Sequence, residues 1–315
     1  MQNASTFEEF YEKELKGLLI PLEKERKVVL HKEFLGYSLL GVSVLLFLIT
    51  ISSQIPPLGF IAFFSFLAGI IFLGVIYGRR KKYFSAFKEN IVRRVINYID
   101  PSMQYNPEIF VSRKDYDRSG LFLQKPDSYK GDDYIEGFRD KTFFRFSELH
   151  TTRQVSTGKS SHTVTIFRGL FFIADFNKHF QGSTYVWSES NPQLNFLTKI
   201  FSSFASDLEK VKLESVDFEN RFIVYSNDQV EARYILTPSF MERIVKLEQL
   251  MGAGISFSFV NTNIYVAVPI NDKLFEPSFY RPNDYQSISD YFNTVHIVFD
   301  IIDELKLNDK LWTKE

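Results

Sequence analysis

Three polar side chains in the middle of the chain have the chemistry of a metal site. Glu148, His150 and His162 supply a carboxylate and two imidazoles, which can hold a zinc ion with one open position. If the two strands that carry them pair about Ser156, His150 lies opposite His162, and the carboxylate two residues away shares its face. The alternative is a frayed hairpin end, because a long loop fixes register poorly. With no cysteine and five scattered histidines, the sequence favours this alternative, so we expect no metal and no other cofactor.

A second short motif, Gly158-Lys159-Ser160, resembles the end of a phosphate-binding loop. That loop requires another glycine five residues before Gly158, and the chain has Arg153 there. The charged segment from Arg153 to His162 also stands between two predicted strands, whereas a phosphate-binding loop leads from a strand into a helix. The sequence therefore favours a flexible polar hairpin loop over a nucleotide site.

A charged cluster later in the chain consists of Asp228, Glu231 and Arg233. A helix that begins here explains the two acids, since Ser226 or Asn227 can cap it and carboxylates favour its positive end. Arg233 does not face Glu231 on a helix, because the two are only two positions apart. We expect Arg233 to form a buried structural ion pair elsewhere in the domain rather than to clamp a ligand.

Composition excludes several classes of chemistry. The 315-residue chain has no cysteine, which excludes disulfides, thiolate nucleophiles and iron–sulfur clusters. Its net charge of -1 gives no general attraction to nucleic acid, so no nucleic-acid partner is expected. A nucleophile elbow, a glycine-rich dinucleotide loop and a metalloprotease helix are all missing from the sequence. No catalytic residue is therefore predicted.

The elements that carry these residues begin with two uncharged apolar runs, Phe34–Ser53 and Ile55–Gly78. The first run has 20 residues, which at about 1.5 Å each span ~30 Å, the thickness of a hydrocarbon core. A pair of core helices in a soluble protein is the alternative, but such helices seldom lack charges over this length. The Glu- and Lys-rich segment before the first run does not resemble a signal peptide. Pro56 and Pro57 keep the connection short, so we predict a transmembrane helical hairpin.

Basic residues predict the orientation of this hairpin. They flank both apolar runs on the outer side and are missing from the connection, so the positive-inside rule places both termini in the cytosol. The lipid bilayer is then the first partner. Within the second run, Ser65 and Gly69 form a small-residue pair that lets the two helices approach closely. The cluster directly after the second run is the candidate set of headgroup contacts: Arg79, Arg80, Lys81 and Lys82.

Amphipathic segments flank the hairpin. Apolar residues recur at three- and four-residue spacing over Tyr11–Val29 and Phe84–Tyr98. Either the two apolar stripes pack on each other or each helix lies on the membrane surface; we predict the former, because both helices leave the same hairpin. We also predict a break at Gly17 and Pro21. Two antiparallel helices should then run without interruption, one from about Leu22 to Ser53 and the other from about Leu58 to Ile99.

The rest of the chain reads as an α+β domain with a largely antiparallel sheet. Asp100-Pro101 ends the second flanking helix. Aromatic and β-branched segments predict strands, and Leu170–Ile173 is apolar on both faces, as in a central strand. The predicted strands are Tyr134–Phe138, Thr142–His150, Thr163–Asp175, Ser183–Trp187, Val211–Leu213, Phe222–Tyr225, Ile255–Phe259 and Ile264–Val268, the last two forming a hairpin around Asn261-Thr262-Asn263.

Helices complete this domain. Thr237-Pro238 begins one that Gly252 and Gly254 end, and Ile288–Leu305 is amphipathic. Asp228–Leu236 favours a helix, and Leu194–Leu208 is read as a helix or a loosely ordered connector. The predicted organisation has four parts: a cytosolic helical segment over 1–33, the transmembrane hairpin over 34–78, a juxtamembrane helix over 79–100 and the cytosolic α+β domain over 101–315.

Several blocks of the sequence are similar to a known family. Ser147-Glu148-Leu149, Phe167-Arg168-Gly169-Leu170 and Asp175-Phe176-Asn177-Lys178 occur in order, followed by a long block from Leu213 to Arg243. With the hairpin, they resemble a bacterial family of two-helix inner-membrane proteins with a cytosolic domain of unknown function. The resemblance covers about Asp132–Val268 and implies a two-pass bacterial inner-membrane protein without assigning a catalytic residue. Members are often encoded beside LemA-like proteins, which implies a LemA-like or other membrane protein as a partner.

These observations favour a membrane-anchored binding or scaffolding module at the cytosolic face. It would recognise a protein, a lipid headgroup or a small ligand. The alternative is a membrane-associated enzyme of a hydrolase-like type, whose site would be assembled from distant residues and leave no local motif. A transporter subunit is disfavoured, because neither apolar run contains the charged residue that a substrate pathway requires.

Overall fold

The computed structural model describes residues 4–53, 55–158, 160–176, 179–189, 207–252 and 254–305. Its contacts divide the chain into two compact units. The first unit consists of Met1–Ile99 together with Phe275–Tyr291, and the second of Asp100–Leu274 together with Phe292–Glu315. The first unit thus includes a segment from near the end of the sequence, which no sequence pattern predicted.

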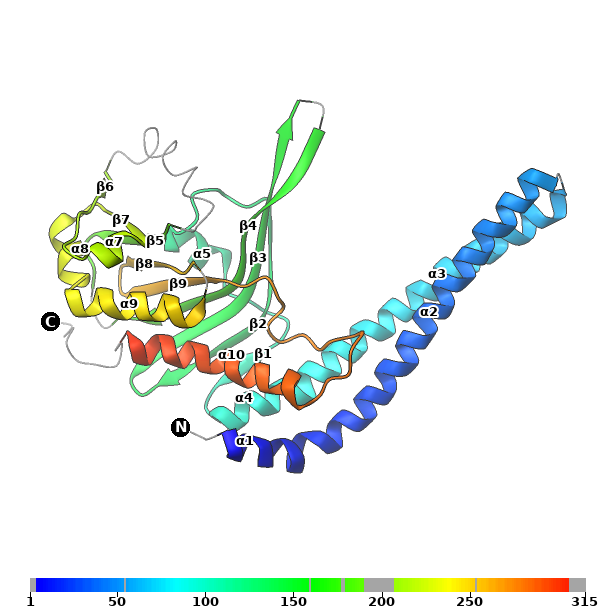
Figure 1. Cartoon of the computed structure of the whole chain (residues 1–315), viewed down its shortest axis with the longest axis horizontal. Helices are drawn as coiled ribbons and strands as arrows, with labels where there is room; N and C mark the ends of the chain where they lie inside the picture. Colours follow the sequence, from blue (N-terminus) through cyan, green and yellow to red (C-terminus); the bar gives the residue numbers. More distant parts are fainter. Residues whose placement is uncertain are drawn as a thin grey trace. The chain divides into compact units, whose positions relative to one another are not determined.

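Two long antiparallel helical rods dominate the first unit (Figure 1). They run over Phe7–Ser53 and Pro56–Ile99, and both are long and apolar enough to cross a membrane. Only 11% and 17% of their most apolar stretches are buried, whereas a core helix of a soluble protein is mostly buried. The prediction of two uninterrupted helices is confirmed. Their segments are α1 (Ala4–Phe10), a π-helix (Tyr11–Leu15), α2 (Lys16–Ser53), α3 (Pro56–Phe87), a second π-helix (Lys88–Val92) and α4 (Arg93–Ile99).

The predicted break at Gly17 and Pro21 is wrong, because α2 runs through both residues. A proline within a helix removes one backbone hydrogen bond, which packing on neighbouring turns can offset. Leu15 and Leu19 supply such packing, since both are buried. The irregularity lies earlier, in the π-helical turn at Tyr11–Leu15.

Small residues let α2 and α3 approach closely. Gly36 lies against Leu73, and Gly69 lies against Leu40, so a side chain at either glycine would collide with the facing leucine. Gly69 is buried and Ser65 half-buried, so the predicted small-residue pair does lie toward the partner helix. The buried positions recur every seven residues, which is typical of helices that pack lengthwise: Val29, Gly36 and Ser43 on α2, and Ala62, Gly69, Ile76 and Tyr83 on α3.

The apolar stripes of the flanking segments face each other only in part. At the chain-terminal end of the rods, the rings of Phe10 and Tyr98 stack with centroids 4.0 Å apart. Nearer the hairpin, Phe84 packs instead against Phe279, with ring centroids 6.0 Å apart. Tyr11 likewise packs against a ring of the same late segment. The segment Phe275–Tyr291 therefore covers apolar surface that was expected to be closed by the two helices alone.

A nine-stranded antiparallel sheet forms the second unit (Figure 1). The spatial order is β1-β2-β3-β4-β9-β8-β5-β7-β6. The predicted α+β class with a largely antiparallel sheet is confirmed, and β4 is the covered central strand that its two-sided apolar run indicated. The strands are β1 (Gln104–Asn106), β2 (Ser128–Arg139), β3 (Thr142–Thr157), β4 (Ser160–Asp175), β5 (Ser183–Ser188), β6 (Glu209–Lys210), β7 (Phe222–Ser226), β8 (Ser256–Val260) and β9 (Asn263–Pro269).

Helices pack on both faces of this sheet. Tyr116 of α5 lies in a core with Phe171 of β4 and Trp187 of β5. On the opposite face, Phe299 of α10 packs edge-on against Phe144 of β3, with centroids 5.9 Å apart. The helices are α5 (Arg113–Ser119), α7 (Val216–Glu219), α8 (Gln229–Ile235), α9 (Pro238–Met251) and α10 (Tyr285–Glu304), of which residues 285–291 belong to the first unit.

Local signals placed most of these elements correctly. Thr237 caps α9, and Gly252 ends it in the left-handed conformation, as predicted. The strand predicted at Val211–Leu213 is wrong: β6 lies at Glu209–Lys210, and Val211 keeps a single backbone bond to Val224. The helix or connector predicted at Leu194–Leu208 lies mostly outside the described residues.

Candidate functional site

The segment predicted as a polar loop, Arg153–His162, is a two-stranded ribbon (Figure 1). Strand β3 continues to Thr157 and β4 begins at Ser160, so the chain reverses at Gly158 rather than at Ser156. Val155 and Thr157 on β3, and Thr163–Thr165 directly after the ribbon on β4, are β-branched residues, which favour strands and help to explain why pairing continues past the predicted turn. A later turn shifts every cross-strand pair from its predicted partner.

His150 consequently lies between two other basic side chains. It pairs with Lys130 on β2 and with Arg168 on β4, while His162 pairs with Val155. The predicted zinc site, with His150 opposite His162, is therefore wrong. Paired residues share a face of the sheet, so Lys130, His150 and Arg168 form a row across three strands, which we call the basic row. Burial, Arg168 and Lys130 together lower the pKa of His150 below the ordinary histidine value.

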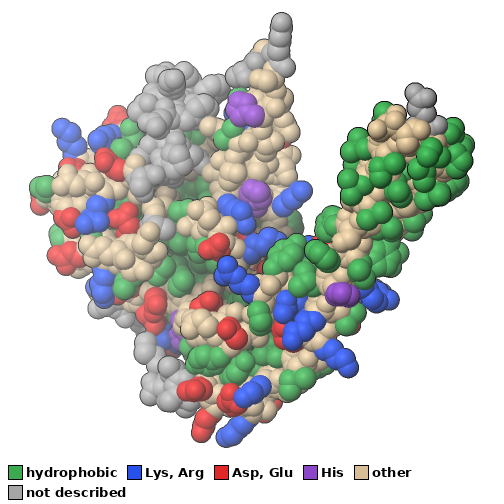
Figure 2. Space-filling view, turned by 45° about the vertical axis from the view of Figure 1, so that its right-hand side comes forward, with side chains coloured by type: hydrophobic (Ala, Val, Ile, Leu, Met, Phe, Trp, Pro, Cys, Tyr) green, Lys and Arg blue, Asp and Glu red, His purple; other side chains and the backbone are tan. Residues whose placement is uncertain are grey.

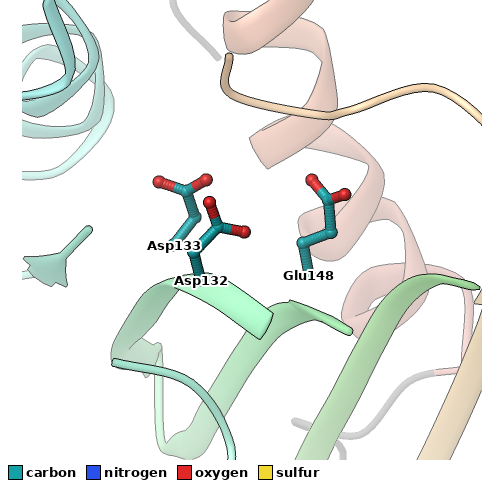
Figure 3. Close-up of side chains that lie close together, drawn as sticks. All are labelled: Asp132, Asp133 and Glu148. Carbon is teal, nitrogen blue, oxygen red and sulfur yellow. The ribbon is translucent and has the colours of Figure 1, made fainter. Parts of the chain in front are cut away.

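An acidic cluster lies two positions along β2 and β3 from the basic row. Figure 3 shows its three side chains. The cluster consists of Asp132, Asp133 and Glu148, which each offer a carboxylate oxygen within 4.8 Å of the others. Asp132 and Glu148 are cross-strand partners. Asp133 is brought to the same side by a bulge in β2, where its φ is 58°. The two acids Asp133 and Glu148 are buried.

Hydrogen bonds hold two of these carboxylates in place. The Tyr105 hydroxyl donates to Asp133 Oδ1 at 2.6 Å, and the backbone N–H of Leu274 donates to Glu148 Oε2 at 3.0 Å. An all-oxygen donor set suits Mg²⁺ or Ca²⁺ rather than zinc. The sequence analysis considered Glu148 but missed Asp132 and Asp133. These adjacent aspartates stand directly before the strand predicted at Tyr134–Phe138, and that position is the signal that could have found them.

Replacing Tyr105 with phenylalanine should destabilise the second unit by about 2 kcal/mol, because a buried carboxylate loses a charge-assisted donor. Urea unfolding followed by Trp187 fluorescence measures this loss. Tyr129→Phe is the matched control: its hydroxyl donates to the Val111 carbonyl at 2.8 Å, so only a neutral hydrogen bond is removed. Equal losses in the two variants would show that Asp133 does not depend on Tyr105.

The four predicted headgroup residues differ in their surroundings. Arg79, Lys81 and Lys82 are exposed on α3. Arg80 instead turns inward, where its guanidinium lies 3.4 Å from Glu33 Oε1 on α2. The same guanidinium lies over the Phe279 ring, 4.3 Å from its centroid. Three of the four side chains are therefore free to meet a surface, and the fourth joins parts of the first unit.

A buried polar network fixes the late segment to the two rods. The side-chain nitrogen of Asn283 lies 3.1 Å from Glu23 Oε1 and 3.0 Å from the Tyr83 hydroxyl. Its side-chain oxygen accepts the backbone N–H of Ser278 at 2.8 Å. Arg26, only 3% exposed, donates to the Phe279 carbonyl at 2.8 Å. Burial also raises the pKa of Tyr83, which keeps its hydroxyl protonated as part of the network.

The comparison with known families matches the second half of the chain. Residues 165–307 match the family model DUF3137, described as a protein of unknown function. The predicted resemblance to a family of unknown function is thus confirmed for this part of the chain. The DUF3137 match begins in β4 and includes Arg168, while Lys130, His150 and the acidic cluster precede it.

Other comparisons add little. The crystal structure of the mycobacterial trehalose monomycolate transport factor A, TtfA, is similar at a TM-score of 0.33 and 10% identity. The match covers 68% of this chain and 96% of that chain, and a TM-score this low supports no argument about function. No curated protein matches the chain at a significant level.

The structure also places two further predicted motifs, one before the matched residues 165–307 and one within them. Lys159 of the phosphate-loop-like motif lies outside the described residues, and Gly158 sits in a strand-to-strand turn, as expected for a hairpin. In the charged cluster, Asp228 itself caps α8 by accepting from two backbone N–H groups, so the prediction of Ser226 or Asn227 as the cap is wrong.

Arg233 does not form the predicted buried ion pair. It is exposed and donates to the Gln229 carbonyl one turn earlier at 3.0 Å. Its neighbour Glu231 has the structural role instead, because its carboxylate accepts the backbone N–H groups of Gln181 and Gly182 at 3.2 and 2.8 Å. This pairing between α8 and the start of β5 could not be read from helix spacing.

Proposed function

We propose that the protein is a two-pass membrane protein whose α+β domain serves as a binding or scaffolding module at the cytosolic face of the inner membrane. This proposal rests on the surface of the first unit between Phe34 and Tyr77. Large apolar side chains cover it, with Phe34 at 70% and Tyr77 at 73% exposure (Figure 2). An apolar surface of this extent calls for lipid or a protein partner to cover it.

The boundary of this surface supports a membrane position. Glu33 precedes the first apolar run, Arg80 follows the second, and their ion pair puts both boundaries at one level of the hairpin. Basic side chains gather at this end (Figure 2). Apart from Arg80, which pairs with Glu33, those that are exposed or half-buried near the boundary are Lys24, Lys27, Lys32, Arg79, Lys81 and Lys82.

Basic residues at one end of a hairpin support a cytosolic placement of that end, where anionic headgroups attract them. We assign Arg79, Lys81 and Lys82 to headgroup contact and Arg80 to the Glu33 pair. With both chain ends on this side, the α+β domain would work at the inner face. A LemA-like or other membrane protein is the proposed macromolecular partner, on the strength of the family resemblance.

Fusion reporters test this topology. Alkaline phosphatase fused after Glu315 should be inactive in a bacterial host, because the enzyme requires export, while a green fluorescent protein there should fluoresce. The matched control is the same phosphatase inserted between Ser53 and Pro56, which should be active. Strong phosphatase activity at the C-terminus would overturn the proposed orientation. Recovery of the full chain in the soluble fraction would overturn the membrane anchor itself.

A further inference from the structure

The basic row is an unusual arrangement for a sheet. Lys130, His150 and Arg168 are direct cross-strand neighbours on β2, β3 and β4. Like charges placed directly opposite each other destabilise a sheet. Burial lowers the pKa of His150 most, and repulsion from Arg168 and Lys130 lowers it further. Such a row requires either acidic partners from the chain or an external anion.

Within the described parts of the chain, acidic partners are missing. No carboxylate lies within the 4.0 Å ion-pair distance of Lys130 or Arg168, and none of the three side chains makes a hydrogen bond there. The neighbouring acidic cluster does not supply these partners, because Asp133 accepts from Tyr105 and Glu148 from Leu274. The basic row is thus left uncompensated beside carboxylates that are engaged elsewhere.

The row is also accessible and fixed in position. Lys130 is exposed, and His150 and Arg168 are half-buried, so the side chains can meet a ligand without unfolding of the sheet. Arg168 is held by its own backbone, since its carbonyl accepts the Ile270 N–H at 3.0 Å. Neighbouring strands are about 4.8 Å apart, so the two outer strands lie ~10 Å apart. Long Lys and Arg side chains can converge over the central imidazole across that distance.

We propose that the basic row is a binding site for a phosphoryl group or a similar tetrahedral dianion. Arg168 can bind two of its oxygens with the planar guanidinium, Lys130 supplies a point charge, and His150 donates from its ring. The ligand could be a soluble phosphomonoester or the phosphate of a lipid headgroup, which share this chemistry. The inference names a ligand for the proposed binding module, but it does not depend on the topology of the hairpin.

Sulfate is the first probe, because it stays a dianion across the pH range in which histidine titrates. The full chain, purified in a non-ionic detergent, is titrated calorimetrically with sodium sulfate at about pH 6.5, against sodium chloride of equal ionic strength. The wild type should bind sulfate. Lys130→Gln and Arg168→Gln should each weaken binding by about ten-fold or more, because each removes a charge-assisted contact.

Arg153→Gln is the matched control. Arg153 is an exposed basic residue of β3, three positions from His150 and on the other face of the strand. Its removal lowers the net charge equally but should leave sulfate affinity within about two-fold. No sulfate binding by the wild type, or equal weakening in Arg153→Gln and Arg168→Gln, would overturn the proposal.

The pH dependence tests the role of His150. Sulfate affinity should rise as pH falls through the pKa of His150, because the bound dianion stabilises the imidazolium that Lys130 and Arg168 otherwise disfavour. The other titratable groups on this side of the sheet are the carboxylates of the acidic cluster, of which Asp132 and Glu148 lie two positions along their strands from Lys130 and His150. Their negative charge would also favour the imidazolium. His150→Gln should remove this pH dependence. An unchanged pH profile in that variant would exclude His150 from the site.

A second experiment distinguishes the two possible sources of the phosphoryl group. Sulfate titration is repeated on the protein in nanodiscs of phosphatidylcholine with and without phosphatidic acid, and in detergent with glycerol 3-phosphate as competitor. If sulfate binding is lost only in discs that contain phosphatidic acid, the ligand is a lipid headgroup. If glycerol 3-phosphate competes with sulfate but phosphatidic acid does not, the ligand is a soluble phosphomonoester. The fusion reporters read topology separately, so either proposal can fail without the other.

Discussion

Replacing Gly169 with alanine is expected to destabilise the second unit by at least ~4 kcal/mol and to prevent accumulation of folded protein. Gly169 has φ 145°, a conformation that side chains rarely adopt. An added Cβ would also collide with the Val268 carbonyl oxygen and lie 2.6 Å from the Ile270 nitrogen. Both obstacles are backbone atoms, one in β9 and the other directly after it, and Ile270 N–H bonds the Arg168 carbonyl of β4. Neither can move without disturbing the pairing of β4 with β9.

The matched control is Gly158→Ala at the tip of the ribbon. Gly158 also has a positive φ, 64°, but no atom lies within 4 Å of an added Cβ. This variant should therefore lose only about 1 kcal/mol, the usual difference for a left-handed residue. Urea unfolding followed by Trp187 fluorescence measures the free energy of unfolding of both variants. Gly169 directly follows Arg168, so the replacement of Gly169 should also abolish sulfate binding. If the two variants have similar stability, the close approach of β4 and β9 is contradicted.

Replacing Asn283 with alanine is expected to release the segment Phe275–Tyr291 from the two helical rods. Asn283 is 4% exposed, and its side chain joins Glu23, Tyr83 and Ser278. Truncation removes the side-chain partner of the buried Tyr83 hydroxyl and of the Ser278 backbone, while Glu23 keeps the Asn283 backbone N–H and Arg26. The local free energy of opening should therefore fall by about 3 kcal/mol. Hydrogen exchange measured by mass spectrometry should show roughly a hundred-fold loss of protection in peptides from this segment.

Two variants separate this network from simple loss of volume. Asn283→Asp keeps the shape and the acceptor for Ser278 but removes the donor to Glu23 and adds a second negative charge, so it should lose protection as well. Asn293→Ala, at an exposed position of α10, should leave exchange unchanged. Full protection in Asn283→Ala would show that the Asn283 side chain is not required and that the remaining contacts, such as the Arg26 hydrogen bond and the packing of Arg80 on Phe279, hold the segment in place.

The two units have different roles in the proposed function. In the first, apolar packing and the Asn283 network hold a late segment of the chain against the proposed membrane hairpin. In the second, a rigid sheet presents the basic row beside the acidic cluster. A binding role at the membrane needs both properties: a stable anchor and a preformed polar surface.

The sequence by itself determined the elements that depend on local chemistry. Uncharged apolar runs of membrane length are visible without a structure, and so is the cap-and-stop pattern of α9 from Thr237 to Gly252. Alternating aromatic and β-branched residues likewise predicted most of the strands and the hairpin of β8 and β9, although β1 was missed and β6 was misplaced. Each of these signals lies within a few residues of the feature that it predicts, which is why a single sequence carries it.

Only the tertiary structure decided which distant residues meet. The turn at Gly158 moved His150 from an expected histidine partner to Lys130 and Arg168, because one change of turn shifts every pair in a hairpin. The bulge at Asp133 completed the acidic cluster. The attachment of Asn283 to Glu23 joins residues 260 positions apart. Register, bulges and long-range contacts depend on packing of the whole chain, and packing leaves no periodic trace in the sequence.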